Sequence, residues 1–95
     1  MSKSVAETVK AHFTKTVGLA SGALSASVYS AERGVLIQAD PANTGNIYIG
    51  DATVSTANGI VLTNKDAVFY ALDNPGPQLY LISDVAAQKV RVMVL

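Results

Sequence analysis

The sequence predicts an all-β protein, a small antiparallel β-sandwich or jelly roll of about seven strands. Short β-rich runs follow one another along the chain, and clusters of Asn, Asp, Gly and Pro separate most of them. The last run alternates apolar and polar residues with the period of a half-buried strand. No segment between runs is long enough for the helical crossover that parallel strands require. The length of 95 residues allows one domain.

The first element, residues 5–17, has two alternatives. Its apolar residues fall mainly on odd positions, which is the alternation of a half-buried strand. Ser4 followed by Glu7 resembles a capping box, which favours a helix instead. The β-branched and aromatic content favours the strand. We therefore expect residues 1–17 to form an N-terminal arm or first strand, and residues 18–95 to form a single β-sandwich domain.

The small residues of 18–27 predict a loop or a weak strand. Pro41 lacks the N–H that a strand ladder needs, so the strand before it ends there. Asn64, Lys65 and Asp66 form a predicted turn, and residues 73–77, with two prolines, form the strongest predicted loop. The further strands are expected at residues 35–39, 46–50, 60–62, 67–72, 79–82 and 89–95.

The composition favours a protein that assembles. Charged residues make up 15% of the chain, against about 25% in typical soluble domains, and the formal net charge is zero. The chain has no cysteine, so no disulfide bond can stabilise this small domain. Oligomerisation remains as the common route to stability. The lysines near the N-terminus and the aspartates of the later chain could attract each other between copies. A compact neutral monomer is the alternative.

No residue pattern indicates catalysis, so we expect no enzyme. His12 is the only histidine, and no motif supplies a nucleophile or an orienting partner for it. The chain has no Cys/His cluster for zinc and no glycine-rich phosphate loop, so no cofactor or metal is expected. Asx turns explain the aspartates, with calcium at a subunit junction as the alternative. They are Asp40, Asp51, Asp66, Asp73 and Asp84.

Nucleic acid and membranes are not expected as partners. Three lysines in the first 17 residues are too few for a nucleic-acid arm, and no apolar stretch is long enough to span a membrane. Tyr48 is predicted to point away from Ile47 and Ile49, and exposed tyrosines are common interface residues. Its alternative role is to cap the sandwich edge. The predicted interface residues are Lys3, Lys10, His12, Phe13, Lys15 and Tyr48.

The last two-thirds of the chain resembles the small β-sandwich virion structural proteins of tailed bacteriophages, of the capsid decoration or cement type. The shared pattern has an apolar strand, an "ADPxNTG" corner, a short strand like "IYIG", a "TxxxGIxL" segment and a closing pair like "LYLIS…QKVRV". One departure is Asn64-Lys65-Asp66, where the pattern usually has Pro-Gly-Glu. The matching residues are 35–40, 43–45, 47–50, 56–62, 79–83 and 88–92.

The resemblance implies a capsid decoration protein that forms a homotrimer. Such a trimer would stabilise the icosahedral shell by bridging major capsid subunits. It would lie on the capsid surface of the virion after synthesis in the host cytoplasm. A neck, connector or tail component is one alternative. A carbohydrate-binding β-sandwich is another, since jelly rolls include lectins, although the chain lacks tryptophan.

Overall fold

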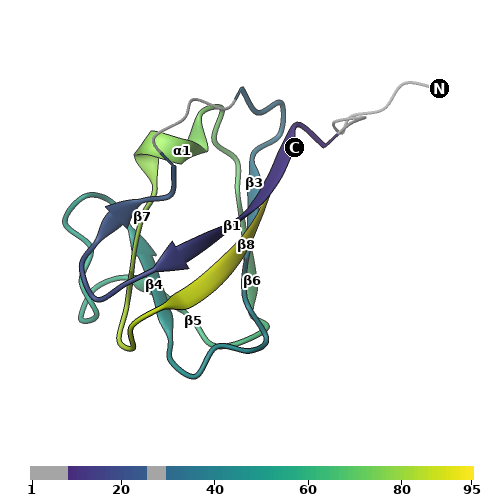
Figure 1. Cartoon of the computed structure of the whole chain (residues 1–95). Helices are drawn as coiled ribbons and strands as arrows, with labels where there is room; N and C mark the ends of the chain where they lie inside the picture. Colours follow the sequence, from purple (N-terminus) through teal and green to yellow (C-terminus); the bar gives the residue numbers. More distant parts are fainter. Residues whose placement is uncertain (1–8, 26–29) are drawn as a thin grey trace.

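The computed structural model describes residues 9–25 and 30–95, and these form an all-β sandwich (Figure 1). The described residues contain eight strands in two antiparallel four-stranded sheets. Sheet A has the order β1 (Ala11–Val17), β8 (Gln88–Val94), β3 (Val35–Ala39) and β6 (Ala67–Tyr70). Sheet B has the order β2 (Gly22–Ala23), β7 (Tyr80–Ser83), β4 (Ile47–Gly50) and β5 (Ile60–Leu62).

The strand order is that of a long hairpin folded over on itself. Strand β1 pairs with β8, β2 with β7, β3 with β6 and β4 with β5, all antiparallel. This is the order expected for an eight-stranded jelly roll. The described residues contain one strand more than the seven expected runs, because β2 forms in the segment that was left open as a loop or weak strand.

The first element is a strand from residue 11 onward, and the helical alternative is wrong there. Strand β1 lies along β8 with Ala11 opposite Val94 and Val17 opposite Gln88. Its odd positions turn toward the core and its even positions are exposed, as the alternation predicts. Residues 1–8, including the start of the predicted strand, lie outside the described part of the chain.

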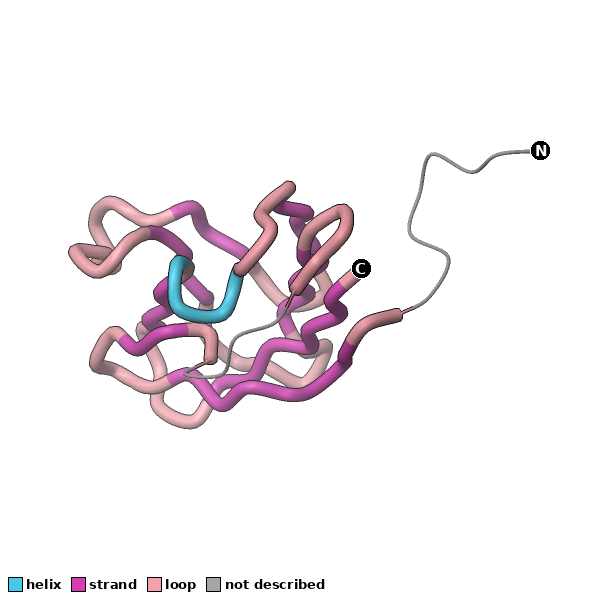
Figure 2. The backbone as a smooth tube through the Cα atoms, turned by 90° about the horizontal axis from the view of Figure 1, so that it is seen from above, coloured by secondary structure: helices cyan, strands magenta, loops and turns pink. Residues whose placement is uncertain are grey.

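A one-turn helix, α1 (Pro75–Gln78), stands where a loop was predicted. Figure 2 shows it as the one helical turn among the strands and loops of the described chain. Proline is favoured in the first turn, because its fixed φ suits the helix and its missing N–H needs no partner there. The N–H of Leu79 donates to the carbonyl oxygen of Pro75 at 3.2 Å, which closes the turn.

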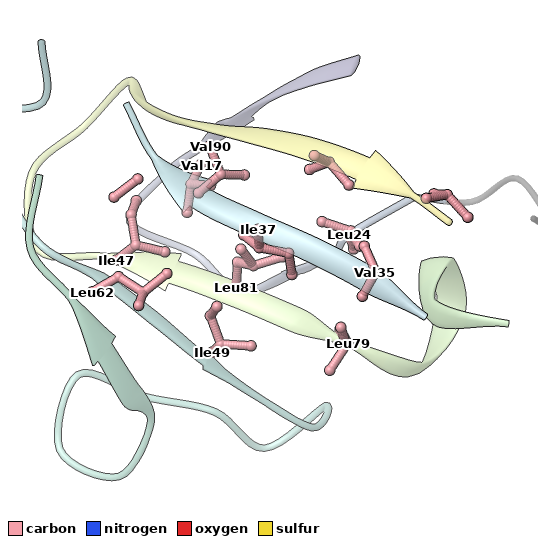
Figure 3. Packing of buried hydrophobic residues seen from close by; sticks show 13 residues of the cluster. Val17, Leu24, Val35, Ile37, Ile47, Ile49, Leu62, Leu79, Leu81 and Val90 are labelled. Atoms are coloured by element: carbon pink, nitrogen blue, oxygen red, sulfur yellow. The ribbon is translucent and has the colours of Figure 1, made fainter. Parts of the chain in front are cut away.

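The core lies between the two sheets, where the alternate side chains of facing strands meet (Figure 3). Ile37 in β3 and Ile47 in β4 are fully buried, and Tyr48 points away from the core, as predicted. The rest of the buried cluster is Val17, Leu24, Val35, Ala39, Ile49, Leu62, Leu79, Leu81, Val90, Val92 and Val94.

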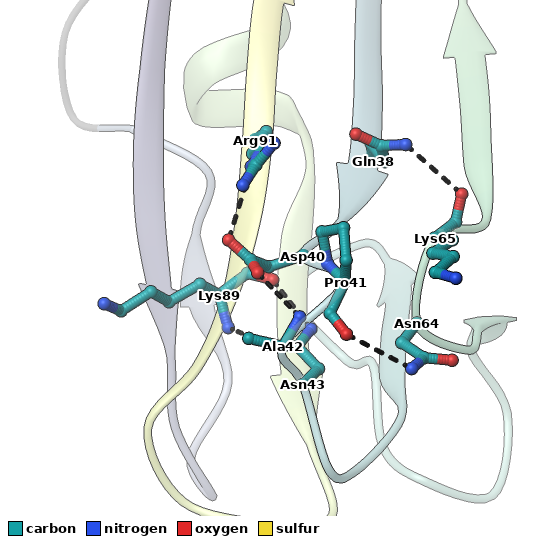
Figure 4. Close-up of polar contacts among 9 residues, drawn as sticks. All are labelled: Gln38, Asp40, Pro41, Ala42, Asn43, Asn64, Lys65, Lys89 and Arg91. Carbon is teal, nitrogen blue, oxygen red and sulfur yellow. Dashed lines mark hydrogen bonds and ion pairs between the residues drawn. The ribbon is translucent and has the colours of Figure 1, made fainter.

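The corner after β3 is tied to β8 by side chains (Figure 4). The side-chain nitrogen Nδ2 of Asn43 donates to the backbone carbonyl oxygen of Lys89 at 2.8 Å. The backbone N–H of Lys89 donates back to Asn43 Oδ1 at 2.9 Å. Arg91 Nε donates to Asp40 Oδ2 at 3.3 Å. These bonds hold the corner in one shape, because the Asn43 side chain pairs with both backbone groups of Lys89 and the Asp40 carboxylate is joined to Arg91.

Gln88 is expected to contribute strongly to the stability of the fold through its buried side chain. It is 6% exposed, and its Oε1 accepts the N–H groups of Thr44 and Gly45 at 2.7 and 2.9 Å. Replacing Gln88 with alanine leaves both donors without this acceptor and should lower the free energy of unfolding by about 2 kcal/mol or more. Urea unfolding tests this, with Gln38→Ala as control, because Gln38 makes one long bond of 3.4 Å. Equal losses in the two variants would contradict the prediction.

Candidate interaction surfaces

The solvent face of sheet A carries a row of side chains that crosses all four strands. The register places Phe69 of β6 opposite Leu36 of β3, Leu36 opposite Met93 of β8, and Met93 opposite His12 of β1. Phe69, Leu36 and Met93 are 42%, 36% and 37% exposed. We call these four residues outer row A. A hollow open to solvent lies over the row, between His12, Leu36 and Met93.

The solvent face of sheet B carries a second row. Tyr48 of β4 lies opposite Val61 of β5 on one side and Ile82 of β7 on the other. Val61 is 49% exposed, and the hydroxyl of Tyr48 donates to Asp84 Oδ2 at 3.4 Å. We call Val61, Tyr48 and Ile82 outer row B. The two faces of the sandwich therefore both present apolar side chains to solvent.

The predicted interface residues of the N-terminal segment lie on or next to β1. Lys10 precedes the strand and its Nζ lies 2.9 Å from Glu32 Oε1. His12 points outward, in outer row A. Phe13 turns inward and packs against the core cluster. Lys15 turns the same way and is half-buried.

The structure does not bring all six predicted residues together. Tyr48 lies in sheet B, on the opposite face of the sandwich from His12. Lys3 lies outside the described residues. The prediction of an interface on β1 and the prediction of one around Tyr48 therefore concern two separate surfaces.

Sequence reasoning missed most of the exposed apolar residues. Leu36 sits in an apolar run, "VLIQA", in which alternation could have marked it as outward. Phe69 lies on the face opposite Val68 and Tyr70, so the same signal was present. Ile60 is 59% exposed although its strand partner Ile49 is buried, and only the position of β5 at the sheet edge explains that.

Asx turns are confirmed for two aspartates. Asp40 Oδ1 accepts the N–H of Ala42 at 2.8 Å. Asp51 Oδ1 accepts the N–H and the hydroxyl of Thr53 at 2.8 and 2.6 Å. The Ala42 N–H holds the pKa of Asp40 below its usual value, and the Thr53 hydroxyl does the same for the pKa of Asp51.

Asp66 and Asp84 act differently from the prediction. Asp66 Oδ2 accepts the hydroxyl and the N–H of Thr63, which precedes it, at 2.7 and 3.0 Å, and the Thr63 hydroxyl lowers its pKa. Asp84 Oδ1 accepts the N–H of Asn46 at 2.8 Å, a contact between distant segments. Within residues 9–25 and 30–95, no three His, Cys, Asp or Glu side chains converge as a metal site would need.

These contacts predict an acid-sensitive fold. Asp40, Asp51 and Asp66 have lowered pKa values, so each carboxylate stabilises the fold above its unfolded-state pKa. That stabilisation is lost as the pH falls through the lowered folded-state pKa values of these carboxyl groups. The free energy of unfolding should thus be steady from about pH 8 to pH 5 and should decline below about pH 4. Urea titrations across this range measure it, and the decline should be shallower in Asp51→Asn. An unchanged stability at pH 2 would contradict the assignment.

Comparison with protein-family models, with curated proteins and with solved structures yields no match to this chain. Among the described residues, no helix has the length and apolar character needed to cross a membrane. Function is therefore inferred from the surfaces of the molecule.

Proposed function

We propose that this chain is a virion structural protein of a tailed bacteriophage, a decoration or cement subunit that works by assembling. Outer row A supports this most directly, because three large apolar side chains lie side by side in solvent on three adjacent strands of sheet A. Small monomers seldom leave such residues contiguous unless the patch binds something. Outer row B, the net charge of zero and the resemblance of the last two-thirds of the chain agree with it.

In the proposed mechanism, several weak contacts between copies of the chain and the capsid together stabilise the assembled shell. Copies of the chain associate as a homotrimer, and each trimer bridges neighbouring major capsid subunits. A protein that binds only the assembled shell stabilises that state by its binding free energy. Several weak contacts per trimer add up, because the later ones form at high effective concentration.

The sandwich suits such a role because side-chain hydrogen bonds hold its surface loops in place. The corner at Asp40 and Asn43 is bonded to β8, and Asp84 joins β7 to the start of β4. A surface held in this way loses little conformational entropy on binding, which leaves more of the apolar burial as net affinity.

The test is the copy number of the chain in purified virions of the phage that encodes it. Quantitative mass spectrometry gives the number relative to the major capsid protein in the same sample. A decoration protein is expected at hundreds of copies per virion and a neck ring at about a dozen, as icosahedral and ring closure require. Absence of the chain from virions that contain the major capsid protein would overturn the proposal.

A further inference from the structure

Sheet A has two open edges of opposite chemistry. Strand β1 forms one edge and pairs with β8, and β6 forms the other edge and pairs with β3. Because neighbouring strands alternate in direction, β6 runs antiparallel to β1. A second copy placed beside the first in the same sheet would therefore bring β6 next to β1 in an antiparallel pair.

We propose that β1 of one copy pairs with β6 of a second copy, with Lys15 opposite Asp66 and His12 opposite Phe69. This inference rests on the proposed function, since it names the surface through which copies of the chain meet. The two sheets A then form one continuous sheet across the contact.

The side on which each residue lies limits the possible registers. Residues directly opposite each other in an antiparallel pair point to the same side of the sheet. Lys15 and Phe13 turn inward on β1, as Val68 does on β6. Lys15 can therefore face Asp66, Val68 or Tyr70, and only Asp66 joins opposite charges. The same register sets Val68 beside Phe13.

The two charged groups are available for this contact. Among the described residues, neither Lys15 nor Asp66 has an ion-pair partner within its own chain. Both bonds to the Asp66 carboxylate, from Thr63, use Oδ2. Oδ1 therefore remains for the Lys15 ammonium of the second copy.

The register also extends outer row A. Phe69 ends the row at β6, and His12 begins it at β1. With Phe69 opposite His12 of the next copy, the rows of two copies form one unbroken line. A cross-strand pair of two rings adds to the stability of such a contact.

Pairing of like edges is less favourable. A β1–β1 pair centred on Thr14 would place the half-buried Lys15 opposite Phe13, and a β6–β6 pair centred on Phe69 would place Asp66 opposite Leu72. Charged residues on edge strands commonly prevent unwanted pairing in this way. Lys15 and Asp66 thus select the β1–β6 contact over the other two.

The contact is head-to-tail, because the two copies contribute different edges. Such contacts build rings when the rotation closes and filaments when it does not. A ring of three would supply the proposed homotrimer.

Charge reversal tests the contact in the full-length protein. We expect Lys15→Asp and Asp66→Lys each to weaken self-association at least about tenfold, and the double variant to recover most of it. Light scattering after size exclusion measures the association, and circular dichroism checks that each variant is folded. Lys89→Asp is the matched control: it makes the same charge change on an exposed residue of the central strand β8 and should leave association unchanged.

Recovery in the double variant would report a contact between copies. Within one chain the two residues lie on opposite edges of sheet A, about 14 Å apart across three strand spacings, beyond the Debye length of about 8 Å at physiological salt. Unchanged association in both single variants, no recovery in the double variant, or a monomeric wild type would overturn the inference. The copy number of the chain in virions is measured on the wild-type protein and does not involve Lys15. It therefore tests the proposed function separately from the β1–β6 contact.

Discussion

Gly34→Ala is expected to destabilise the fold strongly. Gly34 precedes β3 with φ +147°, a backbone conformation that residues with a side chain rarely adopt. A Cβ there would lie 2.0 Å from the carbonyl oxygen of Tyr70 and 2.9 Å from Ala71 Cα, both in the backbone. The glycine also exchanges hydrogen bonds with Leu95 at 3.1 and 2.9 Å, so it cannot move away without opening the opposite contact.

The expected loss in the free energy of unfolding is about 4 kcal/mol or more, in a domain whose total is about 5–15 kcal/mol. Urea unfolding followed by circular dichroism measures it. Gly22→Ala is the control, because a Cβ at Gly22 meets nothing within 4 Å. A Gly34→Ala variant as stable as Gly22→Ala would show that this packing of β3 against β6 is wrong.

Ile37→Ala should give the next largest effect. Ile37 is fully buried in β3, an interior strand of sheet A. Removing three carbons there leaves a cavity that the paired strands on both sides cannot close, with an expected loss of about 2–5 kcal/mol. The measurement is the urea midpoint at constant slope.

Leu36→Ala is the matched control on the neighbouring residue. Leu36 is 36% exposed and lies in outer row A, so its truncation should cost about 1 kcal/mol or less in stability. If Ile37→Ala and Leu36→Ala destabilised the fold equally, the inward and outward assignments of β3 would be contradicted.

The strand content of this chain was predictable because local signals and tertiary contacts agree. In β8, valines alternate with lysine, arginine and methionine, and the structure buries the valines. In β3, Asp40 and Pro41 end the strand as predicted. The two residues of β2 were not predictable, since Gly22 and Ala23 have low strand propensity and their pairing with β7 decides their conformation.

The surfaces were less predictable than the core. Alternation shows which side of a strand a residue faces, but not which strands are neighbours. Outer row A exists only because β6, β3, β8 and β1 adjoin in that order, although they are far apart in the sequence. For the same reason, the sequence alone did not show that Lys15 and Asp66 lie at the two opposite edges of one sheet. That placement follows from the strand order of sheet A.

Copies of this chain are proposed to assemble through their own surfaces. The most direct measurement is the mass of the wild-type protein by light scattering after size exclusion, over a range of concentrations. We predict a mass of at least three times the 9.9 kDa of one chain, because a head-to-tail pair leaves an open β1 edge and an open β6 edge, so association continues to a ring or a filament. A mass of 9.9 kDa at every concentration would contradict the claim.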